Sequence, residues 1–277
     1  MRNTRGWILA ALALAAGPAA RAETVEATST TFLLAGQQNR GGASGTEPEL
    51  ADIATAYEWI TISARELRTP FADNLEIATS VWGSYDMADL RWDNGTSSDV
   101  TGDVMTAYVR AQFLERRLTL RAGRSHVALG NARMIHIDGG DLAARFAGIG
   151  VQAYAGSPVS QRFQSREGLR SWNPLGGDFA YGGRVSYTLS IPGISGRGLD
   201  VGASAAFVDE DGDAVREDVG ADFRLQPFRA VNLTGYTTYS LYAERWAEAM
   251  VMISGPIAPR LHVSADWQYT APDLFLP

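Results

Sequence analysis

The sequence between Leu199 and Ser240 alternates apolar residues with polar or small ones, and this limits what the chain can fold into. The alternation occupies three runs, Leu199 to Phe207, Asp218 to Gln226 and Val231 to Ser240. Successive side chains of a β-strand point to opposite faces of the sheet. The pattern therefore predicts three strands with one apolar and one polar face. Such strands occur in soluble β-sandwiches and in transmembrane β-barrels.

Similar runs occupy most of the remaining chain and predict an all-β protein. They bring the total to about thirteen strands, near the ten-residue length that a transmembrane β-strand needs. The further runs are Thr28 to Leu34, Ala56 to Arg65, Leu75 to Trp82, Val104 to Leu114, Leu118 to Ser125, Ile135 to Phe146, Ile149 to Gly156, Gly183 to Ile191, Trp246 to Ser254 and Leu261 to Thr270. Within Ile135 to Phe146 the apolar phase changes at Gly139 and Gly140, so we expect a β-bulge there.

Residues 1–22 have the pattern of a secretory signal peptide. Arg2 and Arg5 supply positive charge, and an uncharged apolar run from Trp7 to Ala16 follows. Ala20 and Ala22 place small residues where a signal peptidase reads them. The apolar run is too short to span a membrane as a helix. We therefore expect cleavage after residue 22, export of the chain, and one β-barrel domain over residues 23–277.

The composition excludes several classes of function. The chain has a net charge of −7 and no cysteine. An acidic chain lacks the basic surface that nucleic acid requires, so we expect no nucleic-acid partner. Without cysteine there are no disulfides, thiolate metal sites or cysteine nucleophiles. We predict no metal site and no cofactor, because the three histidines do not follow a ligand spacing and no dinucleotide-binding glycine motif joins a strand to a helix.

The connections between the predicted strands are unequal in length. Longer or more polar connections generally follow the odd-numbered strands, and shorter ones follow the even-numbered strands. Outer-membrane barrels have short periplasmic turns and longer external loops, whereas a sandwich gives no reason for such a difference. The asymmetry therefore favours a barrel, although the connections Pro192 to Gly198 and Glu244 to Arg245 fit it less well.

The signal peptide, the paired runs Ala107 to Arg124 and Asp141 to Val159, and the terminal sequence PDLFLP together resemble bacterial outer-membrane β-barrel proteins of the porin-like group. The resemblance implies an antiparallel up-and-down transmembrane barrel of about 12–16 strands when complete. It also implies the outer membrane as location, with outer-membrane lipids and the barrel assembly machinery as partners. The implied function is passive diffusion of small polar solutes, and the oligomeric state stays open.

The C-terminus departs from this group. Bacterial single-chain barrels have even strand counts, and an open barrel leaves sheet edges without partners in lipid. The chain ends at Pro277, where these barrels place an aromatic residue of the final strand. We therefore expect either that the sequence is truncated at its C-terminus or that the strand count is wrong by one.

Charged residues fall on the predicted polar face, where they would line a lumen. An Arg that faces lipid at mid-membrane costs about 2–4 kcal/mol, which supports this facing. The charges would either set the selectivity of an open pore or form a salt-bridged filling of a narrow one. The pore-lining candidates are Arg110, Arg121, Asp138, Asp141, Arg145, Arg184, Asp218, Asp222, Arg224, Glu248 and Asp266.

The longest irregular segment, Ser157 to Asp178, is the candidate for a constriction. It would fold into the lumen and present Arg162, Arg166 and Arg170, or it would lie outside as a solvated surface loop. The acidic segment Asp209 to Asp213 lacks the full spacing of a calcium loop, so we predict a solvated loop there as well.

Two other functions stay open at the level of the sequence. His136 and Asp138 share a strand face, and such a pair with a serine would suit acyl transfer by an outer-membrane hydrolase. No GxSxG motif is present and no serine partner is assigned, so we predict a channel rather than an enzyme. The remaining hypothesis is a structural or adhesive surface β protein, either as a barrel or as a soluble sandwich.

Overall fold

The computed structural model describes residues 24–40, 49–67, 69–86, 100–130, 133–160, 170–171, 178–190, 198–210, 212–228, 230–258 and 260–271. No helix among these residues is long and apolar enough to cross a membrane. The elements are strands: β1 (Thr24–Arg40), β2 (Glu49–Leu67), β3 (Asn74–Asp86), β4 (Val100–Phe113), β5 (Leu118–Leu129), β6 (Arg133–Phe146), β7 (Ile149–Ser160), β8 (Arg170–Ser171), β9 (Phe179–Leu189), β10 (Gly198–Glu210), β11 (Asp213–Phe228), β12 (Val231–Ser240), β13 (Arg245–Ala258) and β14 (Leu261–Thr270). The predicted signal peptide lies outside the described residues and stays a prediction.

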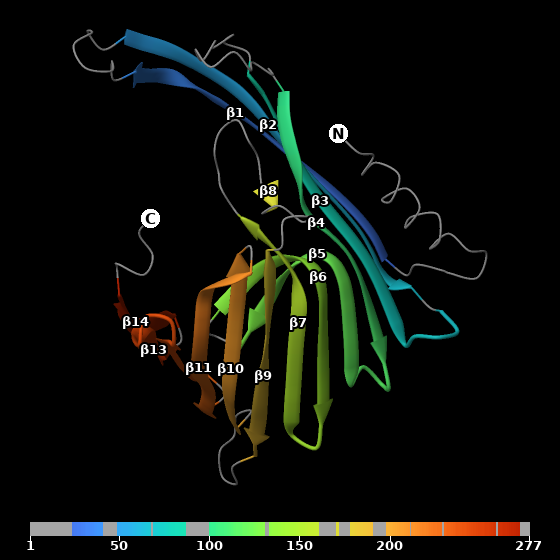
Figure 1. Ribbon diagram of the computed structural model, residues 1–277, viewed down its shortest axis with the longest axis vertical. Coiled ribbons are helices and arrows are strands. Elements are labelled where there is room, and N and C mark those ends of the chain that lie inside the picture. Colours follow the sequence, from blue (N-terminus) through green and yellow to red (C-terminus); the bar gives the residue numbers. More distant parts are fainter. Residues whose placement is uncertain are drawn as a thin grey trace. The chain divides into compact units, whose positions relative to one another are not determined.

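The strands follow one another in the sheet in chain order. The hydrogen-bonded path runs β1-β2-β3-β4-β5-β6-β7-β9-β10-β11-β12-β13-β14, and only the two-residue β8 lies off it, beside β7. Neighbouring strands pair antiparallel, as the ribbons in Figure 1 illustrate for β9, β10 and β11. The predicted all-β, antiparallel, up-and-down arrangement is therefore confirmed, with thirteen strands along the path.

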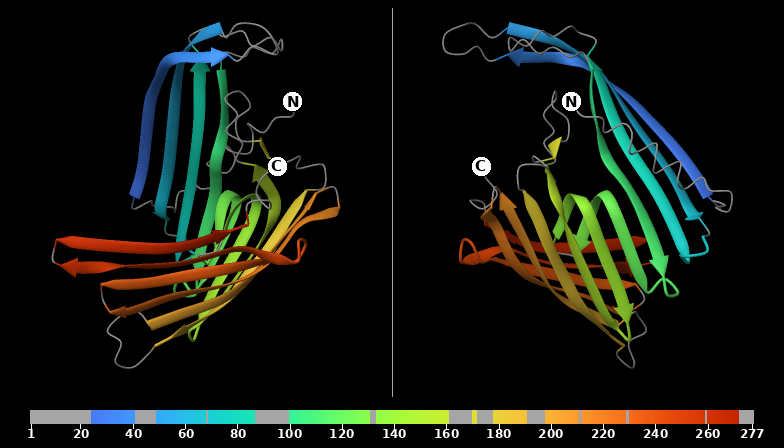
Figure 2. Two further views of the ribbon diagram at one scale, coloured as in Figure 1. Left: turned by 90° about the vertical axis from the view of Figure 1, so that its left-hand side faces the viewer. Right: turned by 45° about the vertical axis from the view of Figure 1, so that its right-hand side comes forward.

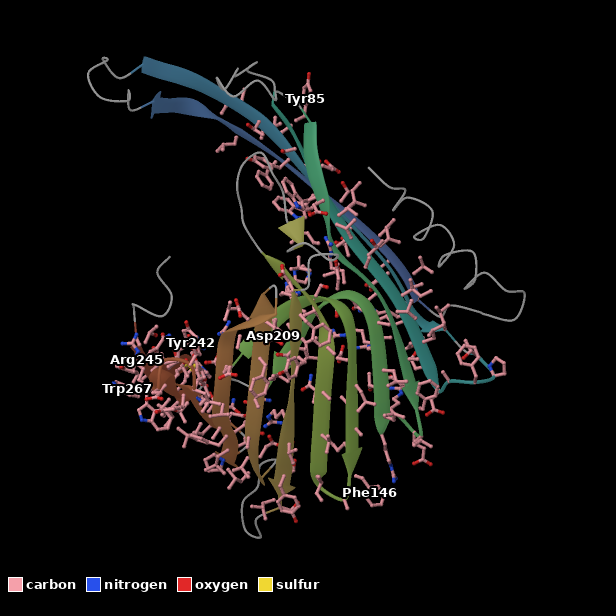
Figure 3. The ribbon with its side chains drawn as sticks, viewed as in Figure 1. Tyr85, Phe146, Asp209, Tyr242, Arg245 and Trp267 are labelled. Carbon is pink, nitrogen blue, oxygen red and sulfur yellow. The ribbon has the colours of Figure 1, made fainter. Side chains whose placement is uncertain are left out.

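The chain divides into two compact units. The N-terminal unit comprises Met1–Val109 and Ser160–Arg170, and the C-terminal unit comprises Arg110–Val159 and Ser171–Pro277. Figure 2 shows the sheet of the C-terminal unit twisting and curving from β5 to β14, as the inherent twist of strands requires. Figure 3 places Phe146 and Asp209 at opposite ends of its strands.

Strands of the N-terminal unit are longer than the sequence predicts. β1 has 17 residues and β2 has 19, and they pair without a break from Thr24↔Arg65 to Arg40↔Glu49. The sequence predicts a first strand only from Thr28 to Leu34, because the polar stretch that follows lacks apolar alternation. Backbone hydrogen bonds of a hairpin do not require apolar side chains, and they continue the strands through this polar sequence.

The N-terminal unit is held together on one face by aromatic side chains. The Phe32 ring stacks on Tyr57 with centroids 4.8 Å apart and on Trp59 at 5.1 Å. The ring centroids of Trp59 and of Trp82 on β3 are 6.3 Å apart. Stacked and tilted aromatic pairs across strands stabilise a sheet beyond the area that they bury, so this row supports the register of β1 to β3.

The strands of the C-terminal unit have one apolar and one polar face, which we call the apolar face and the polar face. The apolar face carries large side chains that are exposed even though they are hydrophobic. They stand at alternate positions of eight strands: Leu120, Leu142, Ile149, Val151, Phe179, Tyr181, Val185, Tyr187, Leu189, Val201, Val219, Val251, Ile253, Leu261, Val263, Trp267 and Tyr269. The polar face carries Arg121, Asp141, Arg184 and Asp222 at the intervening positions.

The acidic segment Asp209 to Asp213 is not a free loop. Asp209 and Glu210 end β10, and Asp213 begins β11, so the hairpin closes almost at once. The register shifts between Val208 and Asp209, which is the irregularity that lets the strands end in a tight turn. The prediction of a solvated loop is therefore wrong for most of this segment.

Candidate functional site

The centre of the polar face is an ionic cluster around Arg184 on β9. Arg184 donates two hydrogen bonds to Asp222 on β11, from Nε to Oδ2 at 2.8 Å and from Nη2 to Oδ1 at 2.6 Å. Its Nη2 also donates to Asp200 on β10 at 2.8 Å, and Thr188 Oγ1 donates to the other Asp200 oxygen at 2.8 Å. The Asp222 side chain is only 2% exposed. Two carboxylates thus hold one guanidinium in a fixed orientation.

A glycine on β10 leaves room for the Arg184 guanidinium to reach Asp222. β10 separates β9 from β11, so the guanidinium must cross it to reach Asp222. Gly202 stands at the crossing, where a Cβ would lie 2.5 Å from both Nε and Nη2 of Arg184. A larger residue would push the guanidinium away, because real Cβ atoms do not approach other atoms so closely. The pairing of Arg184 with Asp222 therefore depends on the absence of a side chain between them.

The turn after β5 lies against the same cluster. Gly130 has a φ of +63°, and a Cβ there would meet the Asp222 carboxylate and stand 2.6 Å from Arg184 Nε. The residues that precede the turn, Val127 and Leu129, are almost completely buried with Ala206 and Val208 of β10. The end of the β5–β6 hairpin therefore covers part of the polar face and narrows the space beside it.

Sequence reasoning missed this inward turn and assigned the constriction elsewhere. Arg162 and Arg166 lie outside the described residues, and of Arg170 only the backbone in β8 is described. The constriction by Ser157 to Asp178 therefore stays a prediction. The sequence does contain a sign of the inward turn. Apolar side chains stand at positions of the polar face in β5 and β6, namely Val127, Leu129 and Ile137.

Further charges of the polar face are paired across or along strands. Arg121 on β5 contacts its neighbour Asp141 on β6, with Nε to Oδ2 at 2.5 Å. Arg216 contacts Asp218 two residues along β11 at 2.6 Å, and the Asp218 side chain is 5% exposed. These pairs make the polar face a charge-balanced surface of fixed side chains.

The remaining candidates do not join one site. Arg145, Arg224 and Asp266 are exposed, and Glu248 is half-buried on β13. Arg110 is two residues from Tyr108 on β4, whose hydroxyl donates to Glu76 of β3 at 2.9 Å. The structure thus brings two of the candidates, Arg184 and Asp222, together with Asp200.

Asp138 lies on the side of β6 that carries Leu142, opposite to Asp141, and its place in a pore stays a prediction. β6 pairs with β5 from Leu118↔Ala144 to Leu129↔Arg133 without a register shift, so the predicted bulge at Gly139 and Gly140 is wrong. Asp138 pairs with Arg124 and Asp141 pairs with Arg121, and three positions along a strand without a register shift place the two carboxylates on opposite sides. Gly139 instead allows β6 to approach β7, since a Cβ there would run into the backbone of Gly156.

The pair proposed for catalysis is engaged in other contacts. Both Asp138 oxygens accept hydrogen bonds from Arg124, at 2.6 Å from Nε and 2.7 Å from Nη2. The ring of His136 stacks on that of His126 with centroids 4.1 Å apart and planes within 9°. This arrangement favours a structural ion pair beside stacked rings over a relay between Asp138 and His136. Among the described residues, no group of three or more His, Asp or Glu side chains could hold a metal ion.

Comparisons with known proteins return structural likeness at low identity. No protein-family model and no curated protein matches the sequence. The chain is similar to the crystal structure of OccAB1 from Acinetobacter baumannii, with 11% identity over 89% of this chain and 80% of that one and a TM-score of 0.40. It is also similar to a mutant of the porin of Rhodopseudomonas blastica, with 12% identity over 89% of this chain and 95% of that one and a TM-score of 0.35.

Proposed function

We propose that this chain forms a β-barrel in the bacterial outer membrane and acts as a passive channel for small polar solutes. The observation that carries the proposal is the opposite character of the two faces of the same strands. Charged side chains pair with one another on one face, and large hydrophobic side chains stand exposed on the other.

The apolar face fits lipid better than water. Soluble monomers rarely expose contiguous apolar patches of more than a few hundred Å². Here exposed hydrophobic residues continue across neighbouring strands, from Leu120 and Leu142 to Val251 and Trp267. In a membrane such a surface contacts lipid instead of water. Backbone groups within the membrane have no water to bond to, and the sheet pairs them with one another.

The polar face fits a narrow aqueous path. Its carboxylates and guanidiniums are held by one another, so they present fixed charges to whatever passes. The β5–β6 turn at Gly130 lies over the Arg184 cluster and reduces the space on this face. Small polar solutes are therefore the expected cargo.

Adjacent substitutions on β13 test the membrane location directly. Val251 is on the apolar face, and Met252 is on the polar face opposite Asp266. We expect Val251→Arg to lower the free energy of unfolding in lipid vesicles by about 2–4 kcal/mol, because the charge faces lipid. Met252→Arg gains Asp266 as a partner and should change stability by less than about 1 kcal/mol. In a soluble sandwich, Val251→Arg would be tolerated in water, so equal stabilities of the two variants in vesicles would refute the proposal.

Conduction is tested with the refolded chain in a planar lipid bilayer. We expect discrete current steps, and heat-denatured protein in the same detergent is the control. Stable insertion without any current steps would contradict the channel and leave a structural barrel protein. Recovery of the native protein from the periplasm without detergent would contradict the membrane location as well.

A further inference from the structure

A small basic pocket opens on the polar face near the end of the sheet that Phe146 marks in Figure 3. Its volume is about 260 Å³, and it lies between β5, β6, β7 and β9 beside the turn that joins β4 to β5. Four arginines line it, Arg116, Arg117, Arg145 and Arg184, together with the polar side chains of Gln152 and Ser186. Among the described residues that line it there is no carboxylate.

The local backbone holds two of these arginines in place. Leu114, Glu115 and Arg116 have φ values of 55°, 56° and 65°, a left-handed turn that is unusual for residues other than glycine. The Arg117 amide donates to the Leu114 carbonyl at 3.2 Å and closes the turn. The Arg145 amide donates to the Arg117 carbonyl at 2.8 Å and ties the turn to β6. The turn thus brings Arg116 and Arg117 to the side of the pocket where β6 places Arg145.

A glycine opens the other side of the pocket. Gly150 on β7 is the cross-strand neighbour of Ser186 on β9. A Cβ at Gly150 would lie 2.6 Å from the Ser186 hydroxyl oxygen. The absence of this atom leaves room beside the hydroxyl, which can donate a hydrogen bond to a bound group.

Carboxylates near the pocket do not neutralise it completely. Asp222 and Asp200 are both bound to Arg184, and Glu115 contacts Arg117 at 3.4 Å between exposed side chains, which is a weak interaction. Arg145 makes no ion pair within 4 Å with any residue that the structure describes. The charged side chains that line the pocket are thus all basic, in a chain of net charge −7, and the carboxylates Asp200, Asp222 and Glu115 stand outside its lining.

We propose that this pocket binds a small, multiply charged oxyanion, a carboxylate or phosphate, dissolved in water. Guanidinium groups bind such anions through parallel hydrogen bonds, and several arginines are needed when the anion carries more than one charge. The volume is slightly below the range of about 300–1,000 Å³ typical of small-molecule pockets, which suits a compact ion. Anion binding by the pocket does not depend on the proposed channel. Only the role of the pocket rests on it, which is to favour anions at one end of the polar path.

Binding is measured by isothermal titration calorimetry with the full chain in detergent micelles, at constant ionic strength, with inorganic phosphate and with citrate. We expect saturable binding of both. Arg145→Gln should weaken it by about tenfold, because one charge-assisted contact is lost. Gln152→Glu keeps the shape of the side chain but places a carboxylate in the pocket, and should weaken binding at least as much. Arg245→Gln removes the same charge from β13 outside the pocket and should change binding by less than about twofold.

Several outcomes would overturn the assignment. Wild-type protein without saturable binding would do so, and so would Arg145→Gln and Gln152→Glu variants that bind as the wild type does. Displacement of phosphate by phosphatidic acid in the micelle, but not by citrate, would show a lipid headgroup site instead of a site for a free solute. The two proposals fail separately: a chain that conducts without binding phosphate contradicts the pocket, and a chain that binds phosphate without conducting contradicts the channel.

Discussion

Two ion pairs of the C-terminal unit have the same chemistry on opposite faces of the sheet. Arg184 with Asp222 and Arg124 with Asp138 each form two hydrogen bonds between one guanidinium and one carboxylate, all at 2.6–2.8 Å. Their surroundings differ. The Asp222 side chain is 2% exposed beneath the β5–β6 turn, whereas that of Asp138 is 31% exposed on the apolar face. Because a buried charge depends more strongly on its partner, we expect the Arg184 pair to be the costlier of the two to break.

Removing the carboxylate of each pair should give the largest change in the free energy of unfolding and the largest difference between the two pairs. Asp222→Ala leaves the Arg184 guanidinium with only Asp200 in a buried place, and should lower the free energy of unfolding by about 3–5 kcal/mol. Asp138→Ala affects a partly exposed pair and should cost about 1–2 kcal/mol. Urea unfolding in lipid vesicles measures both losses. Equal losses would mean that burial does not distinguish the two pairs.

The turn over the Arg184 cluster provides the next test. Gly130→Val adds a β-branched side chain at a left-handed φ and against Asp222, so we expect a loss of about 2–4 kcal/mol and a displaced turn. Gly212→Val is the matched control, because Gly212 has a φ of +94° and no atom within 4 Å of an added Cβ. Its loss should be smaller, since it reports the backbone strain alone.

Single-channel recordings of the same variants test the role of the turn as a constriction. A displaced turn uncovers the polar face beside Arg184, so Gly130→Val should change the conductance. Gly212→Val lies in the β10–β11 turn and should leave it as in the wild type. The same conductance in both variants would show that the β5–β6 turn does not limit the path.

The sequence predicts well which side of a strand a residue faces, and it predicts less well which side chains of one face contact each other. Alternation in Leu199 to Phe207 and Asp218 to Gln226 correctly predicts strands, because side-chain direction is a local property of the backbone. The bulge at Gly139 and Gly140 was predicted wrongly because a Gly-Gly pair fits both a bulge and a close approach of strands, and only the register decides between them. The turn at Gly130 was missed because its contact with Asp222 links segments that are distant in the sequence. The joining of Asp200 to Arg184 was missed because the register, and not the alternation, decides which charges of one face meet.

Replacing both members of a pair gives the smallest expected effect and sharpens the comparison. The double substitution Arg124→Leu with Asp138→Leu exchanges a partly exposed ion pair for apolar side chains on a face that is otherwise apolar. Replacing a buried ion pair by apolar side chains often leaves stability unchanged or raises it. We expect a change within about 1 kcal/mol, or a gain, in lipid vesicles. Arg184→Leu with Asp222→Leu should instead destabilise the chain, because Asp200 loses its guanidinium and remains charged on the polar face. A loss for the Arg124 and Asp138 replacement as large as that for the Arg184 and Asp222 replacement would mean that the apolar face needs its ion pair. That face would then make a polar contact in the membrane rather than meet lipid alone.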